Sequence, residues 1–396
     1  MTTHATPISS ASPSASRWQP QPPVTWQPTP VQQCLLTATV GQGIAALNAW
    51  QIWQAQVDIE NLDEGSYWIL PRLYHSLRQV DQVDLSPEAL QKLQRIKGVY
   101  RHVWSRNQIL LRLLEKAVQT LQQAGISPVV LGGAALVTRP GADVGSRRVD
   151  DMGLWVPFET LPLAIAQLWE AGWQPTQRLE VNQLRSQQTF LGWQQNGYTL
   201  VLYWRVLPEF SSLGVAGDSL TEAETVQLGH TSVLALDPTD QFLLCCIQAT
   251  QWQPRPPFYW LADAAALAQN FTIDGPRLKE KAQTHQLTLA LRESLSVIVP
   301  LLNHLNQSAL TALEQELNHS AISPYEQWEF AAKAQPHPLL GQLPRHWFEY
   351  RRLHPHQSQI RCWQGYLRFL RQRWGIRIWH VSIIFKRLSR LVSGKH

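Results

Sequence analysis

Apolar residues recur at three- and four-residue steps over the first third of the chain, which is the spacing of amphipathic helices. This pattern covers residues 31–80. A longer run begins at Pro87, with Ser86 as a suitable N-cap, and continues to Gly125, where a glycine can take the left-handed conformation that ends a helix. The sequence therefore predicts helical packing up to about residue 125.

After Gly125 the period changes to that of a sheet. "SPVVLGG" and "GLWVP" are short apolar runs typical of strands, and "LPLAIAQLWEAGW" predicts an amphipathic helix that ends at Gly172. "QTFLGWQQNGYTLVLYWRVLP" alternates around Asn196 and Gly197, a strong hairpin signal. Helical periodicity returns from "DPTDQFLLCCIQAT" onward. The pattern predicts an α+β protein, in which a small mixed-sheet domain is flanked by helical N- and C-terminal regions.

These patterns divide the chain into five expected parts. They are a disordered Pro/Ser/Gln-rich leader at 1–33, an N-terminal helical region at 34–125, a small α/β domain at 126–210, a helical domain at 211–340 and a basic, aromatic-rich segment at 341–396.

Composition narrows the class of protein. Of 396 residues, 44% are hydrophobic and 16% are charged, which indicates a globular chain with a sizeable core. The four cysteines form no CxxC pair, so neither a disulfide framework nor a zinc site is indicated. No signal peptide and no spanning segment are predicted. We therefore expect a cytoplasmic protein.

Charge is distributed unevenly. Residues 345–396 hold 12 of the 34 Lys and Arg but only one of the 29 Asp and Glu, Glu349. Arg is interleaved there with Trp, Tyr and Phe, a pattern that suits an anionic partner. A membrane surface and a nucleic acid are two such partners, and packing against the acidic body of the same chain is the third alternative.

Residues 100–290 resemble a known family, the nucleotidyltransferase-like proteins of the polymerase β superfamily, in an uncharacterised bacterial branch. The family pattern has an Asn-containing helix, then "L..aGi.vvlLKGaal", an Arg-containing loop, "mGDiDLLV" and later "vDlHWRL". Here "RNQILLRLLEKAVQTLQQAGISPVVLGGAAL", "RRVDDMGLWVP" and "YTLVLYWRVLP" take these places, with the family's spacing of 17 residues between Gly133 and Asp151.

The resemblance implies transfer of a nucleotidyl group from an NTP to an unknown acceptor, with Mg²⁺ as cofactor. Gly132 and Gly133, at a strand-to-helix turn, would let backbone N–H groups approach the phosphates. Arg147 and Arg148 would bind the nucleotide as well, or only solvate a loop. Asp151 is the expected metal ligand and a catalytic residue.

Two of the three expected carboxylates are missing in this chain. Laid on "GDIDLLV", "DDMGLWV" places Gly153 at the second aspartate, and "LVLYWRV" laid on "VDLHWRL" places Val201 at the third and Tyr203 at the histidine. Asp150 is a candidate replacement if a β-bulge turns it inward beside Asp151.

An acidic residue from elsewhere, Glu180 or Glu209, is the other candidate replacement. Asp263, in "WLADAAAL", is instead predicted to cap a helix or to pair within the helical domain. The sequence leaves two functions open: nucleotidyl transfer at a degraded active site, and a non-catalytic descendant that binds a nucleotide or a partner.

Overall fold

A computed structural model describes the chain in eight segments. These are residues 27–78, 86–176, 189–205, 223–251, 258–302, 308–334, 339–354 and 359–373. Most of the expected leader lies outside them, but its last residues begin the first helix.

Four helices form the N-terminal region. They are α1 (Pro30–Val40), α2 (Gly43–Gln56), α3 (Glu64–Leu77) and α4 (Pro87–Gln123), with a short 3-10 turn, η1 (Ile59–Asn61), before α3. Ser86 caps α4 and Pro87 lies in its first turn, as predicted. Gly125 has a φ of +77°, which confirms the expected left-handed end of this helix.

A seven-stranded mixed sheet follows. Its strands and the helices between them are β1 (Val129–Leu131), α5 (Gly132–Val137), β2 (Met152–Trp155), η2 (Phe158–Thr160), α6 (Leu161–Glu170), β3 (Gln174–Pro175), β4 (Phe190–Gln195), β5 (Tyr198–Tyr203), β6 (Ala223–Leu228) and β7 (Thr231–Leu236). The strand order is β3-β4-β5-β2-β1-β7-β6. Asn196 and Gly197 both have positive φ, so the predicted hairpin between β4 and β5 is confirmed.

The sheet extends past residue 210, where the α/β domain was expected to end. The hairpin of β6 and β7 lies in the part expected to be helical, and β7 pairs in parallel with β1. β6 is an edge strand whose sequence, "AETVQL", carries three polar residues, so its apolar alternation is weak. The turn at Gly229, with a φ of +60°, is the one clear local signal.

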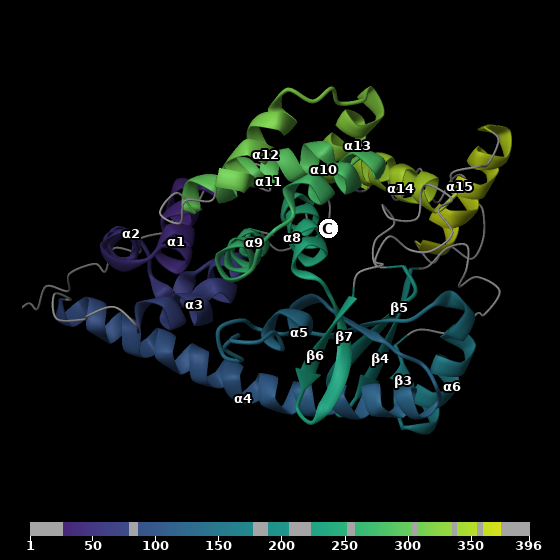
Figure 1. Ribbon diagram of the computed structural model, residues 1–396, viewed down its shortest axis with the longest axis horizontal. Coiled ribbons are helices and arrows are strands. Elements are labelled where there is room, and N and C mark those ends of the chain that lie inside the picture. Colours follow the sequence, from purple (N-terminus) through teal and green to yellow (C-terminus); the bar gives the residue numbers. More distant parts are fainter. Residues whose placement is uncertain are drawn as a thin grey trace, which may run out of the picture.

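Helices cover both faces of the sheet. α4 runs beneath it and α6 lies beside α4, while α8 and α9 approach from the other side (Figure 1). Alternate residues of a strand point to opposite faces. Val130, Leu154 and Leu202 accordingly pack with α4 and α6, whereas Val129 and Leu131 belong to the core of the helical regions.

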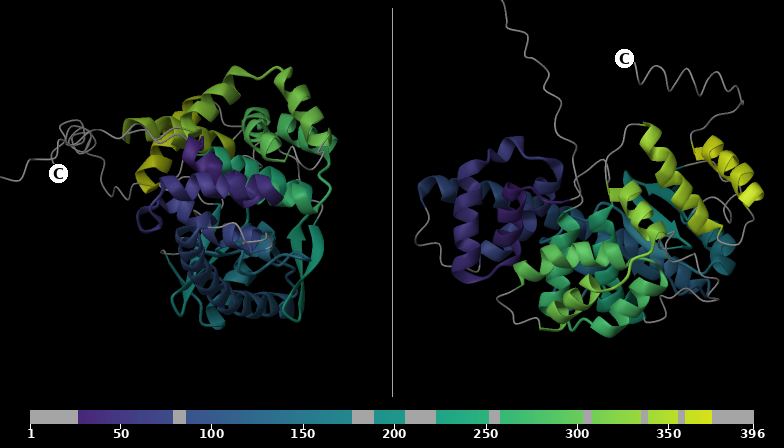
Figure 2. Two further views of the ribbon diagram at one scale, coloured as in Figure 1. Left: turned by 90° about the vertical axis from the view of Figure 1, so that its left-hand side faces the viewer. Right: turned by 90° about the horizontal axis from the view of Figure 1, so that it is seen from above.

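The remaining helices form the C-terminal part. They are α8 (Pro238–Thr250), α9 (Tyr259–Asn270), α10 (Gly275–Thr284), α11 (Thr288–Leu301), α12 (Ser308–Asn318), α13 (Pro324–Ala334), α14 (Leu339–Leu353) and α15 (Gln359–Arg373). Figure 2 shows α14 and α15 at the edge of this layer. Helical regions thus lie on both sides of a mixed sheet in the chain, and the predicted α+β class is confirmed.

Part of the basic C-terminal segment packs against the acidic body of the chain. Arg352 of α14 is buried, and its Nη2 and Nε both donate to Oε2 of Glu329 on α13, at 2.6 and 3.0 Å. Within the described residues, no helix is both long enough and apolar enough to cross a membrane. Residues 374–396, the most apolar part of this segment, lie outside the description.

Candidate functional site

The segment that leads into β2, residues 138–151, is fixed by helices of the N-terminal region. Asp143 accepts hydrogen bonds from the Tyr100 hydroxyl (2.9 Å) and from Nη2 of Arg78 (2.7 Å). It also accepts one from the backbone N–H of Gly145 (2.7 Å). Burial raises the pKa of Asp143, but the hydrogen bonds from Gly145, Tyr100 and His75 outweigh it, so the pKa lies below its ordinary value. Asp143 is therefore ionised at neutral pH, and in this form it holds the 138–151 segment against Tyr100 and Arg78.

Two residues of α4 satisfy the backbone of the same segment. Asn107 donates from Nδ2 to the carbonyl oxygens of Val144 (2.6 Å) and Arg147 (2.7 Å), and its Oδ1 accepts from the N–H of Val149 (3.2 Å). Arg106 donates to the carbonyl oxygen of Val149. Buried backbone groups need such partners. The asparagine of the family pattern thus has a physical role here, because it holds the chain in place just before Asp151.

Asp263 joins three parts of the chain. Its Oδ1 accepts from Nη2 of Arg72 on α3 at 2.6 Å, and its Oδ2 accepts from Nε of Arg147 at 2.8 Å. The Arg147 guanidinium also lies 4.9 Å from the ring centroid of Trp260. The carboxylate and both guanidinium groups are largely buried. The predicted pairing of Asp263 exists, but its partners come from α3 and the 138–151 segment and not from the helical domain.

Gly132 and Gly133 occupy the turn between β1 and α5. Gly132 has a φ of +64°, which favours glycine. A Cβ built on Gly133 would lie 2.0 Å from Nη1 of Arg147. Nη1 is itself held by the carbonyl oxygen of Arg148 at 2.7 Å, so it has little freedom to move. The missing side chain at position 133 therefore makes room for Arg147, and phosphate binding by these glycines stays a prediction.

Arg148, Asp150 and Asp151 end the segment in front of β2. Nε of Arg148 contacts Oδ1 of Asp150 at 2.7 Å, and both side chains are about one-third exposed. Asp151 is partly buried and forms no ion pair with a described residue. Burial raises the pKa of Asp151, the neighbouring charge of Asp150 raises it further, and Arg147 opposes both. Asp151 is thus a carboxylate whose charge is incompletely compensated.

The register of the sheet brings the two substituted positions together. Gly153 of β2 pairs directly with Val201 of β5, so the positions of the second and third family aspartates are neighbours on one face. Burial and then the charge of Asp151 raise the pKa of Tyr203, two residues further along β5. Of the three aspartates in the family pattern, this chain therefore keeps only the first, Asp151.

The two proposed replacements stay predictions. The regular pairing of β2 with β1 and β5 begins at Met152, so it does not include Asp150, whose carboxylate contacts Arg148. Glu180 and Glu209 lie outside the described residues. Within the described part of the chain, no three His, Cys, Asp or Glu residues gather as a metal site.

We expect Asp151→Asn to stabilise the protein at neutral pH. Because the pKa of Asp151 is raised in the folded state, folding favours its protonated form, and the ionised form costs stability as the pH rises above the ordinary aspartate value of about 3.9. The free energy of unfolding should rise by about 0.5–2 kcal/mol at pH 7, the range usual for removing an uncompensated functional group. Urea unfolding at pH 7 and pH 4 measures this. A gain that stays equal at both values, or no gain at pH 7, would contradict the assignment.

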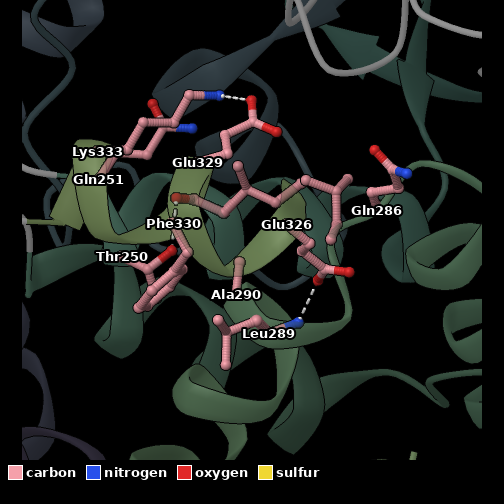
Figure 3. Close-up of a pocket in the computed structure, with 11 residues that line it drawn as sticks. Thr250, Gln251, Gln286, Leu289, Ala290, Glu326, Glu329, Phe330 and Lys333 are labelled. Carbon is pink, nitrogen blue, oxygen red and sulfur yellow. Dashed lines mark hydrogen bonds and ion pairs between the residues drawn. The ribbon is translucent and has the colours of Figure 1, made fainter. Parts of the chain in front are cut away.

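One hollow adjoins this site, and another lies in the helical region. A small one, lined by Arg72, Arg147, Arg148 and Asp263 among others, adjoins the buried ion pairs. Another, of about 330 Å³, lies within the helical region between α8, α11 and α13 (Figure 3). Its carboxylates have structural partners, since Glu326 accepts from the N–H of Leu289 and Glu329 pairs with Lys333. This second hollow is lined by no residue of the sheet.

Comparison with known proteins gives distant likenesses among solved structures and a match to one family model. The chain matches none of the curated proteins. Among solved structures it is similar to ANT(2")-Ia in complex with adenylyl-2"-tobramycin, with 12% identity, 52% of this chain and 96% of that chain covered, and a TM-score of 0.30. It is also similar to an antigenic nucleotidyltransferase-like protein from Paracoccidioides brasiliensis, with 13% identity, 55% and 94% covered, and a TM-score of 0.32.

A family model extends over more than half of the chain. It is described as an uncharacterised nucleotidyltransferase and matches residues 68–303. That range begins at Trp68 on α3 and includes α4, the whole sheet and all of α11, so it contains every residue of the site described above. The chain therefore belongs to this family of uncharacterised nucleotidyltransferases.

Proposed function

We propose that this protein binds a nucleoside triphosphate at the end of β2 and transfers its nucleotidyl group, slowly, to an acceptor. The observation that carries the proposal is Asp151, a partly buried carboxylate in the family's first aspartate slot that forms no ion pair with a described cation. We also propose that the family is a bacterial branch of the polymerase β superfamily and that the protein is cytoplasmic, from the motif spacing and composition.

One Mg²⁺ fits these residues better than two. Magnesium often takes one or two carboxylates and completes its shell with water and substrate phosphates, so Asp151 and a triphosphate suffice for one ion. A pair of ions about 4 Å apart repels strongly and needs several carboxylates, which Gly153 and Val201 do not supply. When bound, Mg²⁺ would offset the negative charge of the phosphates.

The residues around Asp151 have separable roles in this proposal. The backbone N–H groups at Gly132 and Gly133 lie at a strand-to-helix turn, where they can bind phosphate oxygens. Arg148 has Nη groups outside its contact with Asp150 and can bind the same anion. Arg147 contacts both Asp263 and the turn at Gly132 and Gly133, so its role is to position these groups.

The experiment titrates labelled ATP, GTP, CTP and UTP in the presence of Mg²⁺ and follows pyrophosphate release in the same samples. We expect at least one nucleotide to bind, release to be slow, and Asp151→Ala to abolish release while the far-UV spectrum stays unchanged. Binding with no release would favour the non-catalytic descendant. Equal binding and release by wild type and Asp151→Ala would refute the proposal.

We further propose that α15 docks to an anionic membrane surface. Its outward stripe combines Trp363, 57% exposed, and Leu367, 40% exposed, with Arg368, and α15 contains no acidic residue. Trp363 stacks on Trp347 of α14, with ring centroids 4.8 Å apart, which fixes its orientation. An exposed apolar stripe beside cationic side chains suits the headgroup region of a bilayer.

Co-sedimentation with vesicles tests this docking. We expect binding to phosphatidylserine vesicles but not to phosphatidylcholine vesicles, and a clear loss of binding in Trp363→Ser, with Gln364→Ser as the control on the same helix. Binding to single-stranded RNA but not to vesicles would indicate that α15 binds nucleic acid, and it would refute the membrane assignment.

A further inference from the structure

A partly enclosed cavity separates α3 from α4 beside the segment that precedes Asp151. It holds about 450 Å³ of space, part of which is open to solvent. Its lining combines an apolar wall with three basic side chains. The residues are Tyr67, Trp68, Pro71, Val99, His102, Val103, Arg106 and Arg148.

The charge of the cavity is one-sided. Arg106 and Arg148 line it, His102 is exposed next to them, and none of the lining residues is acidic. Asp150 offsets part of the Arg148 charge through Nε. The only described hydrogen bond of the Arg106 side chain runs from Nη1 to Val149, so its remaining N–H groups are available to a ligand. Such a site favours an anion, and a guanidinium fork matches a phosphate in particular.

Contacts within the protein hold both Arg148 and Arg106 in place before any ligand binds. The Arg148 guanidinium lies 5.0 Å from the ring centroid of Trp68, and Arg106 is tied to the backbone of Val149. Trp68 is itself packed against Tyr259, with ring centroids 5.0 Å apart. Fixed donors lose little conformational entropy on binding, which increases affinity.

The apolar wall comes from both helices. Val99 and Val103 lie four residues apart on one face of α4, the face that also carries His102 and Arg106. Across from them lie Pro71 and Tyr67, the latter 38% exposed. A planar ring fits against this wall while its phosphate meets the guanidinium groups.

We propose that the cavity between α3 and α4 binds a phosphate monoester that carries a planar ring, such as a nucleotide unit, as the acceptor of the transfer. A hydroxyl oxygen of this acceptor would form a bond to the α-phosphorus of the NTP while the bond between that phosphorus and pyrophosphate breaks, so that pyrophosphate leaves and the hydroxyl proton passes to solvent. Its position supports this role, because Arg148 lines the cavity and lies only three residues before Asp151. The acceptor role rests on the proposed function, whereas binding to the cavity does not.

The test measures binding of AMP, ribose 5-phosphate and adenosine by calorimetry, with EDTA present so that no metal takes part. We expect AMP to bind, ribose 5-phosphate to bind more weakly because it lacks the ring, and adenosine to bind not at all. Arg106→Ala should weaken AMP binding by about tenfold or more, the usual effect of losing a hydrogen bond to a charged group. His102→Glu, an exposed position, should weaken it as well.

Arg101→Ala is the matched control, since Arg101 is an exposed arginine of the same helix that does not line the cavity. Asp151→Asn should leave AMP binding unchanged, which separates this cavity from the triphosphate site. If AMP fails to bind, or binds equally to the wild type, Arg106→Ala and His102→Glu, the assignment is overturned even where the NTP experiment succeeds. Failure of transfer with AMP binding intact would refute only the acceptor role.

Discussion

Replacing Asp263 by alanine is expected to lower the free energy of unfolding by about 3–5 kcal/mol, the cost of leaving buried charges unpaired. The Asp263 carboxylate receives one guanidinium on each oxygen, Arg72 at 2.6 Å and Arg147 at 2.8 Å, and the three side chains are at most 13% exposed. Its loss leaves two buried cations facing each other. Urea denaturation, with the midpoint and slope fitted together, measures the change.

The matched control is an ion pair of the same length on the surface. Arg95 and Glu60 are 2.7 Å apart, but both side chains are at least half exposed. Glu60→Ala should therefore cost less than about 1 kcal/mol. Asp263→Asn, which keeps the size of the side chain and one acceptor oxygen, should lie between the two. Equal effects of Asp263→Ala and Glu60→Ala would show that the buried ion pairs contribute no special stability.

Introducing a carboxylate at position 201 is expected to raise Mg²⁺-dependent pyrophosphate release on the order of 100-fold, if the protein binds an NTP as proposed. A second metal ion contributes several kcal/mol to phosphoryl-transfer chemistry, and about 1.4 kcal/mol corresponds to a factor of ten. Val201 is the better of the two positions. At Gly153 a Cβ would lie 3.1 Å from Cβ of Leu131 and 3.3 Å from its carbonyl oxygen.

Two control variants make this result interpretable. Val201→Asn has nearly the same shape as Val201→Asp without the charge, and the double variant Val201→Asp with Asp151→Ala removes the partner carboxylate, so neither should gain activity. Mg²⁺ should raise the melting temperature of Val201→Asp more than that of the wild type, because an ion that binds only the folded state stabilises it. A folded Val201→Asp protein that binds NTP but gains neither rate nor Mg²⁺ stabilisation would contradict the prediction.

Local signals account for the parts of this fold that the sequence predicts well. The cap at Ser86, the left-handed Gly125 and the Asn196-Gly197 turn each depend on a few neighbouring residues. The family resemblance also placed Gly153 and Val201 in the carboxylate slots, and the structure pairs these two residues in the sheet. What the sequence could not predict was the pairing itself, because two strands 48 residues apart in sequence can be aligned in several ways.

Long-range partners account for what the sequence did not predict. Arg72 and Asp263 are separated by 191 positions, and no pattern within either helix links them. Gly133 matched a phosphate-binding turn, yet the structure places the Arg147 guanidinium over it. The hairpin of β6 and β7 was missed because an edge strand needs only one modestly apolar face.

The single helix α4 determines how the protein can move. It has 37 residues, which corresponds to a rod of about 55 Å. Leu93 and Ile96 near its beginning belong to the core of the helical regions, whereas Leu110 and Leu121 belong to the core under the sheet. Two cores that share one unbroken rod cannot separate by a hinge in a linker. Any opening between them must bend the rod or slide one layer across it, so mechanical strain applied at one core is transmitted to the other.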